Sequence, residues 1–258
     1  MTLFDLTGKI AIITGSSRGI GKAIAHAFAE HGARVVISSR KQEACDAVAD
    51  EINARYGAGR AVAIAASLSD RTALEALVAK TREQLGPIDL LVCNAASNPH
   101  YGPLASISDE QFHRILDNNI IANHWLIRMV APDMAAAGEG SIIIVSSIGG
   151  LIASTHIGAY NISKAADFQL ARNYAAELGP KGIRVNCIAP GLIKTDFARA
   201  LWENPEVLAQ RVKSTPLQRI GEPEDIAGAA VFLAAPAGRF MTGQSIVIDG
   251  GTIICSAH

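Results

Sequence analysis

Residues 10–21 read Ile-Ala-Ile-Ile-Thr-Gly-Ser-Ser-Arg-Gly-Ile-Gly, a short β-branched run followed at once by three closely spaced glycines. From Ile20 to His31 the apolar positions recur with the period of a helix. A strand, a glycine-rich turn and a helix in this order predict the first unit of an α/β fold. Glycines at a helix start let backbone N–H groups approach an anion, so this turn is a candidate pyrophosphate site.

Six further apolar runs of strand length follow along the chain, and most are apolar throughout rather than alternating. They span residues 34–38, 61–65, 90–93, 142–145, 184–188 and 245–248, with helical periodicity at 72–85, 109–137 and 159–178. Continuous apolar strands are typical of a parallel sheet covered on both faces. We therefore predict that residues 1–258 form one domain, a Rossmann-like doubly wound parallel sheet of about seven strands with helices on both faces. Ser108 and Gln111 predict a capping box before the helical pattern at 109.

Composition excludes several classes of function. The formal net charge is -1 and no Lys/Arg run is present, which argues against a nucleic-acid partner. No apolar stretch approaches the roughly 18 residues of a membrane span, and the start lacks the regions of a signal peptide. The tail Ser256-Ala257-His258 differs from the peroxisomal Ser-Lys-Leu address. Four scattered cysteines without a CxxC pair indicate a reducing compartment and no metal site, so we expect a cytoplasmic protein that binds small molecules.

The spacing of the first turn, G-x-x-x-G-x-G, differs from the common G-x-G-x-x-G fingerprint, and a tight turn that binds nothing is the alternative. After the second strand the chain reads Ser38-Ser39-Arg40-Lys41, with no acid before Glu43 to bond the ribose hydroxyls of NAD. Arg40 and Lys41, with Arg18 in the turn, offer cationic donors to a 2′-phosphate. The sequence therefore predicts NADP(H), the alternative being a solvated helix start.

Tyr160 and Lys164 stand at positions i and i+4 of a helical pattern, so their side chains share one face. Lowering the pKa of a tyrosine from about 10 to about 7 requires roughly 4 kcal/mol. A charge about 4 to 5 Å away supplies roughly that amount at an effective dielectric near 20. We expect Lys164, together with the positive ring of an oxidised nicotinamide, to supply it. An ordinary amphipathic edge is the alternative for this pair.

Polar residues also follow the predicted strands, at the sheet edge where open α/β folds bind ligands. Ser147 follows the fifth strand and can donate to a substrate oxygen, although a turn cap explains it equally well alone. Asn94 follows the fourth strand, and Asn119 lies in the helical pattern after it. Both asparagines also have structural interpretations, because Asn favours turns and breaks helices.

Together with Arg184 to Gly191 and Ile248-Asp249-Gly250-Gly251, these motifs resemble those of the short-chain dehydrogenase/reductase family in order and approximate spacing. The resemblance runs over essentially the whole chain. It implies that Tyr160 is the general acid in reduction and the base in oxidation, and that Ser147 orients and polarises the carbonyl. It further implies that Lys164 binds the nicotinamide ribose and lowers the Tyr160 pKa, while Asn119 holds a water that links Lys164 to solvent.

The same resemblance implies a set of cofactor contacts and a homotetramer. The contacts are Gly15, Ser17, Arg18, Gly19, Ile20, Gly21, Ser39, Arg40, Leu68, Asn94, Ala95, Ala96, Tyr160, Lys164, Pro190, Gly191, Ile193 and Thr195. The chain departs from the family pattern at Ala96, where glycine is usual, and at Ser67-Leu68, where an aspartate is usual. These departures put cofactor affinity in more doubt than the chemistry.

Within the family, residues 39–42, 94–99 and 190–195 are similar to the dehydrogenase/reductase member 4 subgroup of NADPH-dependent carbonyl and retinal reductases. The insertion at about 194–216 predicts a lid, and the substrate pocket is predicted from Ser147, His156, Tyr160, Phe197 and Trp202. This mostly apolar pocket favours apolar or aromatic ketones and aldehydes. A 3-oxoacyl-[acyl-carrier-protein] reductase, with Arg199 and Arg211 as its basic patch, is one alternative. A catalytically silent NADP-binding regulator is another.

Overall fold

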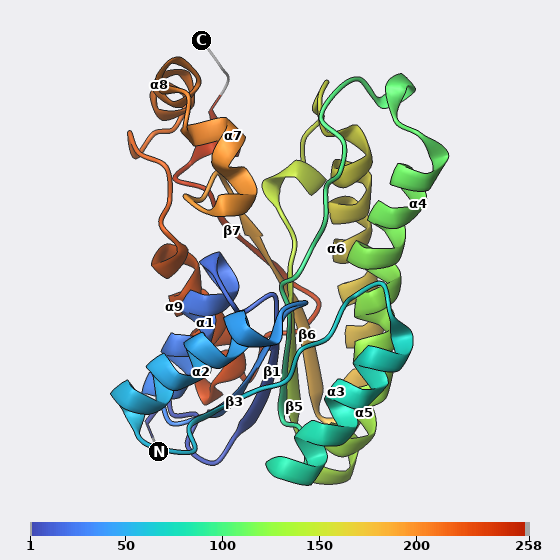
Figure 1. Cartoon of the computed structure of the whole chain (residues 1–258), viewed down its shortest axis with the longest axis vertical. Coiled ribbons are helices and arrows are strands. Elements are labelled where there is room, and N and C mark those ends of the chain that lie inside the picture. The colour runs from blue at the N-terminus through green and yellow to red at the C-terminus, as the bar shows by residue number, and fades with distance from the viewer. Residues whose placement is uncertain (1, 256–258) are drawn as a thin grey trace.

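Seven parallel strands form the centre of residues 2–255, the part of the chain that the computed structural model describes (Figure 1). The strands are β1 (Ile10–Thr14), β2 (Arg34–Ser38), β3 (Ala61–Ala63), β4 (Leu90–Cys93), β5 (Gly140–Val145), β6 (Ile183–Pro190) and β7 (Ser245–Ile248). Their order in the sheet is β3-β2-β1-β4-β5-β6-β7. The predicted doubly wound sheet is confirmed, although β3 ends two residues early and β6 runs on to Pro190. Met1 and the tail tripeptide lie outside the described residues.

Helices cover both faces of the sheet (Figure 1). One face carries α1 (Gly19–Glu30), α2 (Gln42–Tyr56) and α9 (Pro223–Ala234), and the other carries α3 (Arg71–Gln84), α5 (Ala122–Ala137) and α6 (Gly158–Leu178). Ala11 and Ile13 of β1 pack into the core beneath α1, α2 and α9, whereas Ile12 packs into the core beneath α3, α5 and α6. Since successive strand residues face opposite ways, both sets must be apolar, which explains the unbroken hydrophobic runs.

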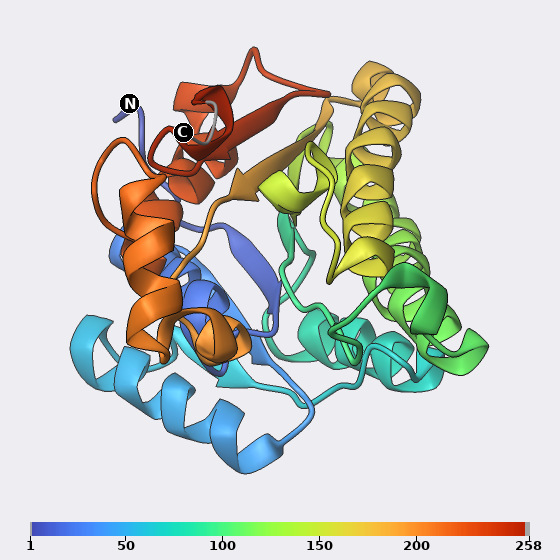
Figure 2. The ribbon, with the colours of Figure 1, turned by 90° about the horizontal axis from the view of Figure 1, so that it is seen from above.

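The strand order reverses at β1, which lies between β2 and β4, and ligands of open α/β sheets bind at the carboxyl edge of such a point. Thr14 joins the two strand ends there, because its Oγ1 accepts hydrogen bonds from the backbone N–H groups of Asn94 (3.0 Å) and Ala95 (3.1 Å). Viewed from above, α7 (Arg199–Trp202) and α8 (Pro205–Lys213) stand over this edge (Figure 2). The fold thus gathers the predicted site residues at one end of the sheet.

The predicted helix at 109–137 is wrong in its middle. The capping box of Ser108 and Gln111 is confirmed at the start of α4 (Asp109–Leu116), but a π-helical turn at Asp117–Ile121 separates α4 from α5. Both asparagines of this turn bond to Ser97: Nδ2 of Asn118 donates to the Ser97 hydroxyl (3.0 Å), and Oδ1 of Asn119 accepts from the Ser97 backbone N–H (2.8 Å). Such turns accommodate an extra residue and occur frequently at functional sites.

Within residues 2–255, no helix has both the length and the apolar character that crossing a bilayer demands. The same residues contain no group of three or more His, Cys, Asp or Glu side chains placed to hold a metal ion. All four cysteines are free thiols, and Cys45, Cys93 and Cys187 are buried.

Candidate active site

The glycine turn between β1 and α1 has no room for larger side chains at its glycines. Gly15 and Gly19 have positive φ angles of 66° and 54°, and a Cβ on Gly21 would lie 2.5 Å from both the Asn94 amide nitrogen and the Gly15 carbonyl oxygen. Arg18 precedes α1; its backbone is extended, and its side chain makes no hydrogen bond that caps the helix. The first N–H groups of α1 are therefore free of a side-chain cap and suit a pyrophosphate.

Asn94, a predicted cofactor contact, holds the turn itself. Its Nδ2 donates to the carbonyl oxygens of Thr14 (2.9 Å) and Gly15 (3.3 Å). On the other side, Ser16 Oγ donates to the carbonyl of Ile13 (2.7 Å) and accepts from the N–H of Ser38 (2.9 Å). The turn is thus fixed to the neighbouring strands from both directions.

The insertion, residues 194–216, begins against this turn. Arg18 forms an ion pair with Asp196 (Nη1 to Oδ2, 3.2 Å), and Asp196 also pairs with Arg199 (2.8 Å). Hydrogen bonding from Arg199 and the charges of both arginines lower the pKa of Asp196. A Cβ on Gly19 would lie 3.1 Å from the methyl group of Thr195.

The remaining predicted cofactor contacts occupy the same edge of the sheet. Ser39 and Arg40 follow β2, where Ser39 Oγ lies 3.2 Å from the thiol of Cys45 and Arg40 is exposed. Gly191 follows β6, and its N–H donates to the carbonyl of Ile248 (2.8 Å). The other members of the set, Ser17, Ile20, Leu68, Ala95, Ala96, Pro190 and Ile193, lie in or beside the segments that follow β1, β3, β4 and β6.

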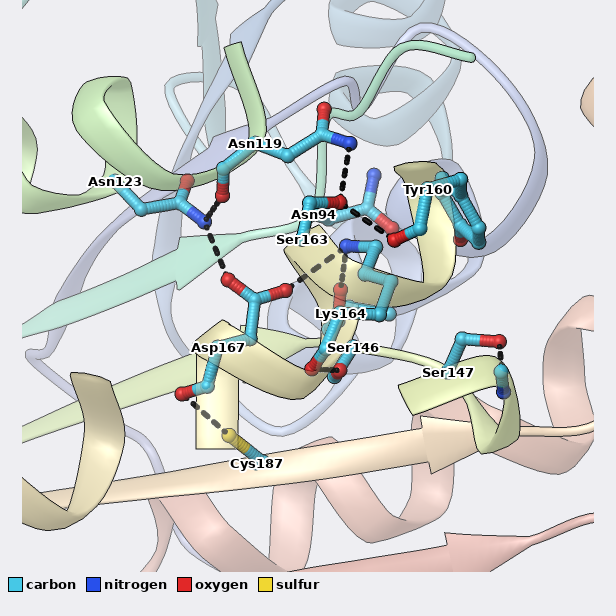
Figure 3. A network of polar contacts seen from close by, with 12 residues as sticks. Asn94, Asn119, Asn123, Ser146, Ser147, Tyr160, Ser163, Lys164, Asp167 and Cys187 are labelled. Atoms are coloured by element: carbon cyan, nitrogen blue, oxygen red, sulfur yellow. Dashed lines mark hydrogen bonds and ion pairs between the residues drawn. The ribbon is translucent and has the colours of Figure 1, made fainter. Parts of the chain in front are cut away.

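Tyr160 and Lys164 lie in the first turns of α6, close to the end of β5 (Figure 3). The Lys164 Nζ is 5.6 Å from the centre of the Tyr160 ring, and the ring of Phe197 lies 5.9 Å from it. Ser147 follows β5, and its Oγ accepts a hydrogen bond from the N–H of Gly149 (3.0 Å), which leaves the hydroxyl hydrogen for another acceptor. The structure thus places Ser147, Tyr160 and Lys164 around the end of β5.

Lys164 is almost fully buried, with 2% of its side chain exposed, and its ammonium is held on two sides. It donates to the carbonyl of Val145 (2.9 Å) and to Oδ2 of Asp167 (3.1 Å), as Figure 3 shows. Asp167 has no exposed side-chain surface and also accepts from Nδ2 of Asn123 (3.3 Å). Neither Asp167 nor Asn123 was predicted as a site residue; the available signal was an acid three residues after Lys164.

Asn119 is buried and is connected to α6 through a serine. Its Nδ2 donates to Ser163 Oγ (3.0 Å), which in turn donates to the backbone carbonyl of Tyr160 (2.7 Å). The carbonyl of Asn119 accepts from Nδ2 of Asn123 (2.6 Å), so the π turn is connected to Asp167 as well (Figure 3). Ser163 is a further member of this network that sequence reasoning missed.

Lys164 lowers the pKa of Tyr160 as expected, but that pKa is raised overall. Burial raises the pKa of Tyr160; Lys164 opposes this rise, Asp167 adds to it and Ser147 opposes it. Burial has the largest effect on the pKa of Lys164 and would lower it, but the charges of Asp167 and Tyr160 and the hydrogen bond to Asp167 together outweigh burial and raise it, so the ammonium persists. Lys164 alone does not lower the pKa of Tyr160 below its ordinary value, because burial, and to a smaller extent the charge of Asp167, act in the opposite direction.

The predicted substrate-pocket residues lie in two groups. Phe197 of the insertion contacts the Tyr160 ring, and Trp202 donates from its indole nitrogen to the carbonyl of Thr195 (2.8 Å). His156, by contrast, is exposed and stacks on Tyr101 at 5.3 Å between ring centres. The structure therefore brings an aromatic side chain of the insertion to Tyr160, the predicted catalytic tyrosine.

Comparison with known proteins places this geometry in context. A family model described as enoyl-(acyl carrier protein) reductase matches residues 15–252. The rat protein dehydrogenase/reductase SDR family member 4 is 41% identical over 249 residues, which cover 96% of this chain and 88% of the relative. A 7α-hydroxysteroid dehydrogenase solved with NADH and a 7-oxo bile acid has a TM-score of 0.92 and 38% identity, covering 96% of each chain. A gluconate 5-dehydrogenase of Burkholderia cenocepacia solved with NADP and tartrate has a TM-score of 0.93 and 31% identity, covering 98% of each chain.

Proposed function

We propose, for a chain that belongs to the short-chain dehydrogenase/reductase family, that it is an NADP(H)-dependent reductase of apolar or aromatic ketones and aldehydes. Its membership supports an oxidoreductase that interconverts carbonyl and alcohol groups. The observation that carries the proposal is the meeting of three features at one sheet edge: the uncapped start of α1, the hydroxyl of Ser147, and the Tyr160–Lys164 pair of α6.

In the proposed reaction, Tyr160 donates its phenolic proton to the carbonyl oxygen while Ser147 orients that oxygen. A reduced nicotinamide, when bound, supplies the hydride. Lys164 would hold the nicotinamide ribose and stabilise the phenolate that forms, since its ammonium lies over the Tyr160 ring. Asn119 acts through Ser163, which fixes the backbone of Tyr160.

The NADP preference is supported by the charges around the adenosine side of the predicted site. Arg40 is exposed after β2, and no carboxylate lies between that strand and Glu43, whereas Arg18 in the glycine turn is paired with Asp196. We expect Arg40→Ala to reduce kcat/KM for NADPH by about 10- to 100-fold, because hydrogen bonds to charged groups contribute roughly 1.5–3 kcal/mol. The value for NADH should change little. The matched control is Arg55→Ala, because Arg55 is an exposed arginine in the following helix, α2. A higher kcat/KM with NADH in the unmodified enzyme contradicts the assignment.

The substrate class is supported by Phe197, whose ring contacts Tyr160 and is 56% exposed. The alternative, a 3-oxoacyl-[acyl-carrier-protein] reductase, requires a basic patch at the mouth of the site. Arg199 is one of the two candidate residues for this patch, but it is already paired with Asp196, which argues against the acyl-carrier reductase. Assays with an acetoacetyl thioester beside a panel of small ketones discriminate between the two.

A screen of NADPH consumption over carbonyl compounds, with Tyr160→Phe as the control, tests the function as a whole. Loss of the proton donor should lower the rate by about 10²- to 10⁴-fold, and a fluorescence titration measures how much NADPH binding the variant keeps. If the variant equals the wild type, Tyr160 is not the acid. If NADPH binds but no carbonyl is reduced, the chain is a regulator.

We also propose a homotetramer in the cytoplasm. The oligomer rests on the family resemblance, and size-exclusion chromatography with light scattering measures it. The compartment rests on the free thiols of Cys45, Cys93 and Cys187, which suit reducing surroundings.

A further inference from the structure

Asp167 is a buried carboxylate that the proposed reaction does not use. It lies in α6 one turn after Lys164, with its side chain fully buried, at 3.1 Å from the Lys164 ammonium and 3.3 Å from Nδ2 of Asn123. A carboxylate inside a protein is costly unless it is paired and hydrogen-bonded, and here it is both. Its position next to the lysine of the catalytic pair calls for a functional account.

The lysine has three N–H donors, and two of them are committed. One points to the carbonyl of Val145 and one to Asp167, so the ammonium is held at a defined place beside the end of β5 (Figure 3). Asn123 fixes the other carboxylate oxygen and also donates to the carbonyl of Asn119 in the π turn. Asp167 therefore anchors Lys164 to α5 and to the π turn, as well as to its own helix.

Asp167 and Lys164 are both charged, because each stabilises the charged form of the other. Burial raises the pKa of Asp167, while Lys164 and Asn123 oppose that rise. A neutral Asp167 would leave the buried ammonium without a counter-charge, and the 3.1 Å separation favours the charged form of both groups. The other titratable groups that act on them are the thiols of Cys93 in β4 and Cys187 in β6, whose pKa values burial raises, so both stay neutral.

The charges that decide the state of Tyr160 are thus those of Lys164 and Asp167. With Tyr160 as a phenol, the buried cluster of three groups is neutral, and loss of the phenolic proton makes it net negative. Without the carboxylate, and with Lys164 still protonated, the cluster would be net positive, and the same loss would neutralise it. Inside the protein, Tyr160 therefore loses its proton much more easily when the carboxylate is absent than when it is present.

We propose that Asp167 is a positioning residue whose carboxylate balances the charge of Lys164 and so keeps Tyr160 a proton donor, extending carbonyl reduction to alkaline pH. This inference rests on the proposed function, because it assigns Tyr160 the role of acid. Its counterpart is that alcohol oxidation, which needs the phenolate, begins only at higher pH than the Tyr160–Lys164 pair alone would permit.

The test compares pH profiles of kcat/KM in both directions for the wild type and Asp167→Asn, which keeps the shape and a hydrogen-bonding oxygen. The alkaline fall of reduction and the alkaline rise of oxidation should both move to lower pH, by about one to three units. Glu177→Gln is the matched control: it removes one negative charge from an exposed position of the same helix and should leave both limbs in place. Coincident profiles for wild type and Asp167→Asn overturn the proposal.

A second measurement does not depend on the Asp167 variant folding. The chain has four tyrosines, so the tyrosinate absorbance lost in Tyr160→Phe isolates the titration of Tyr160. In the wild type without cofactor, that difference should show no ionisation below about pH 9. Ionisation near neutrality would overturn the proposal. If instead Tyr160→Phe retains full carbonyl reduction, the proposed function fails, whereas a failure confined to the pH profiles leaves it standing.

Discussion

The sheet wall of the site and the insertion are built differently. The sheet wall comprises the ends of β1, β4 and β5, the π turn and the start of α6, where Thr14, Lys164 and Asn119 are buried and hydrogen-bonded. The insertion, residues 194–216, carries the helices α7 and α8, and neither contains a buried residue. It meets the glycine turn through the exposed ion pair of Asp196 with Arg18.

This difference separates two tasks. Groups that transfer protons must keep their geometry, and burial with satisfied hydrogen bonds secures it. A surface that admits substrates of varied shape gains from short helices with few buried contacts, which open at low free energy. The two regions should therefore respond differently to substitution: the sheet wall in stability and chemistry, the insertion in substrate preference.

The largest effect should come from breaking the ion pair of the sheet wall on one side. Lys164→Met leaves Asp167 buried without its counter-charge, so we expect a loss of about 3–5 kcal/mol in the free energy of unfolding, measured with urea, along with loss of activity. The stability deficit should shrink as the pH falls, because the pKa of the unpaired carboxyl is raised and protonation relieves it. The double variant Lys164→Met with Asp167→Leu should recover most of the stability and none of the activity. A double variant as unstable as the single one would show that the pair is not the cause.

A smaller effect should follow from filling the glycine turn. The methyl group of Gly21→Ala would meet the Asn94 amide and the Gly15 carbonyl at 2.5 Å, so the turn must shift. Such overpacking costs about 1–3 kcal/mol, and we expect NADPH to bind about 10- to 100-fold more weakly in a fluorescence titration. Gly228→Ala in α9 meets nothing within 4 Å and serves as the matched control. Unchanged NADPH affinity in Gly21→Ala would argue against the turn as the pyrophosphate site.

The sequence predicted the sheet well because its signals are local. Unbroken apolar runs and the glycine turn each depend on residues within one element, and the strands fall where those runs do. The π turn was missed because it depends on contacts of Asn118 and Asn119 with Ser97, 21 and 22 residues away. Local periodicity carries no trace of them.

Asp167 escaped prediction for a related reason. An acid three residues from a lysine in a helix is typical of a solvated face, and nothing in the local pattern shows that this face is buried. Its burial depends on packing against β6 and on Asn123, 44 residues earlier in the chain. The chemical types of Ser147, Tyr160 and Lys164 were readable from motifs, but the charge balance among them required the tertiary structure.

The smallest effect should come from the insertion. Phe197→Ala removes an aromatic ring that lies 5.9 Å from Tyr160, and such contacts contribute about 0.5–1.5 kcal/mol. We expect the KM for aromatic ketones to rise by about 2- to 10-fold, while the KM for small aliphatic ketones and the melting temperature change little, because Phe197 is 56% exposed. Phe240→Ala is the matched control, since that ring is fully exposed outside the insertion. Equal effects on aromatic and aliphatic substrates would mean that the insertion does not select by contact with the ring, and the comparison with the sheet wall would lose its functional meaning.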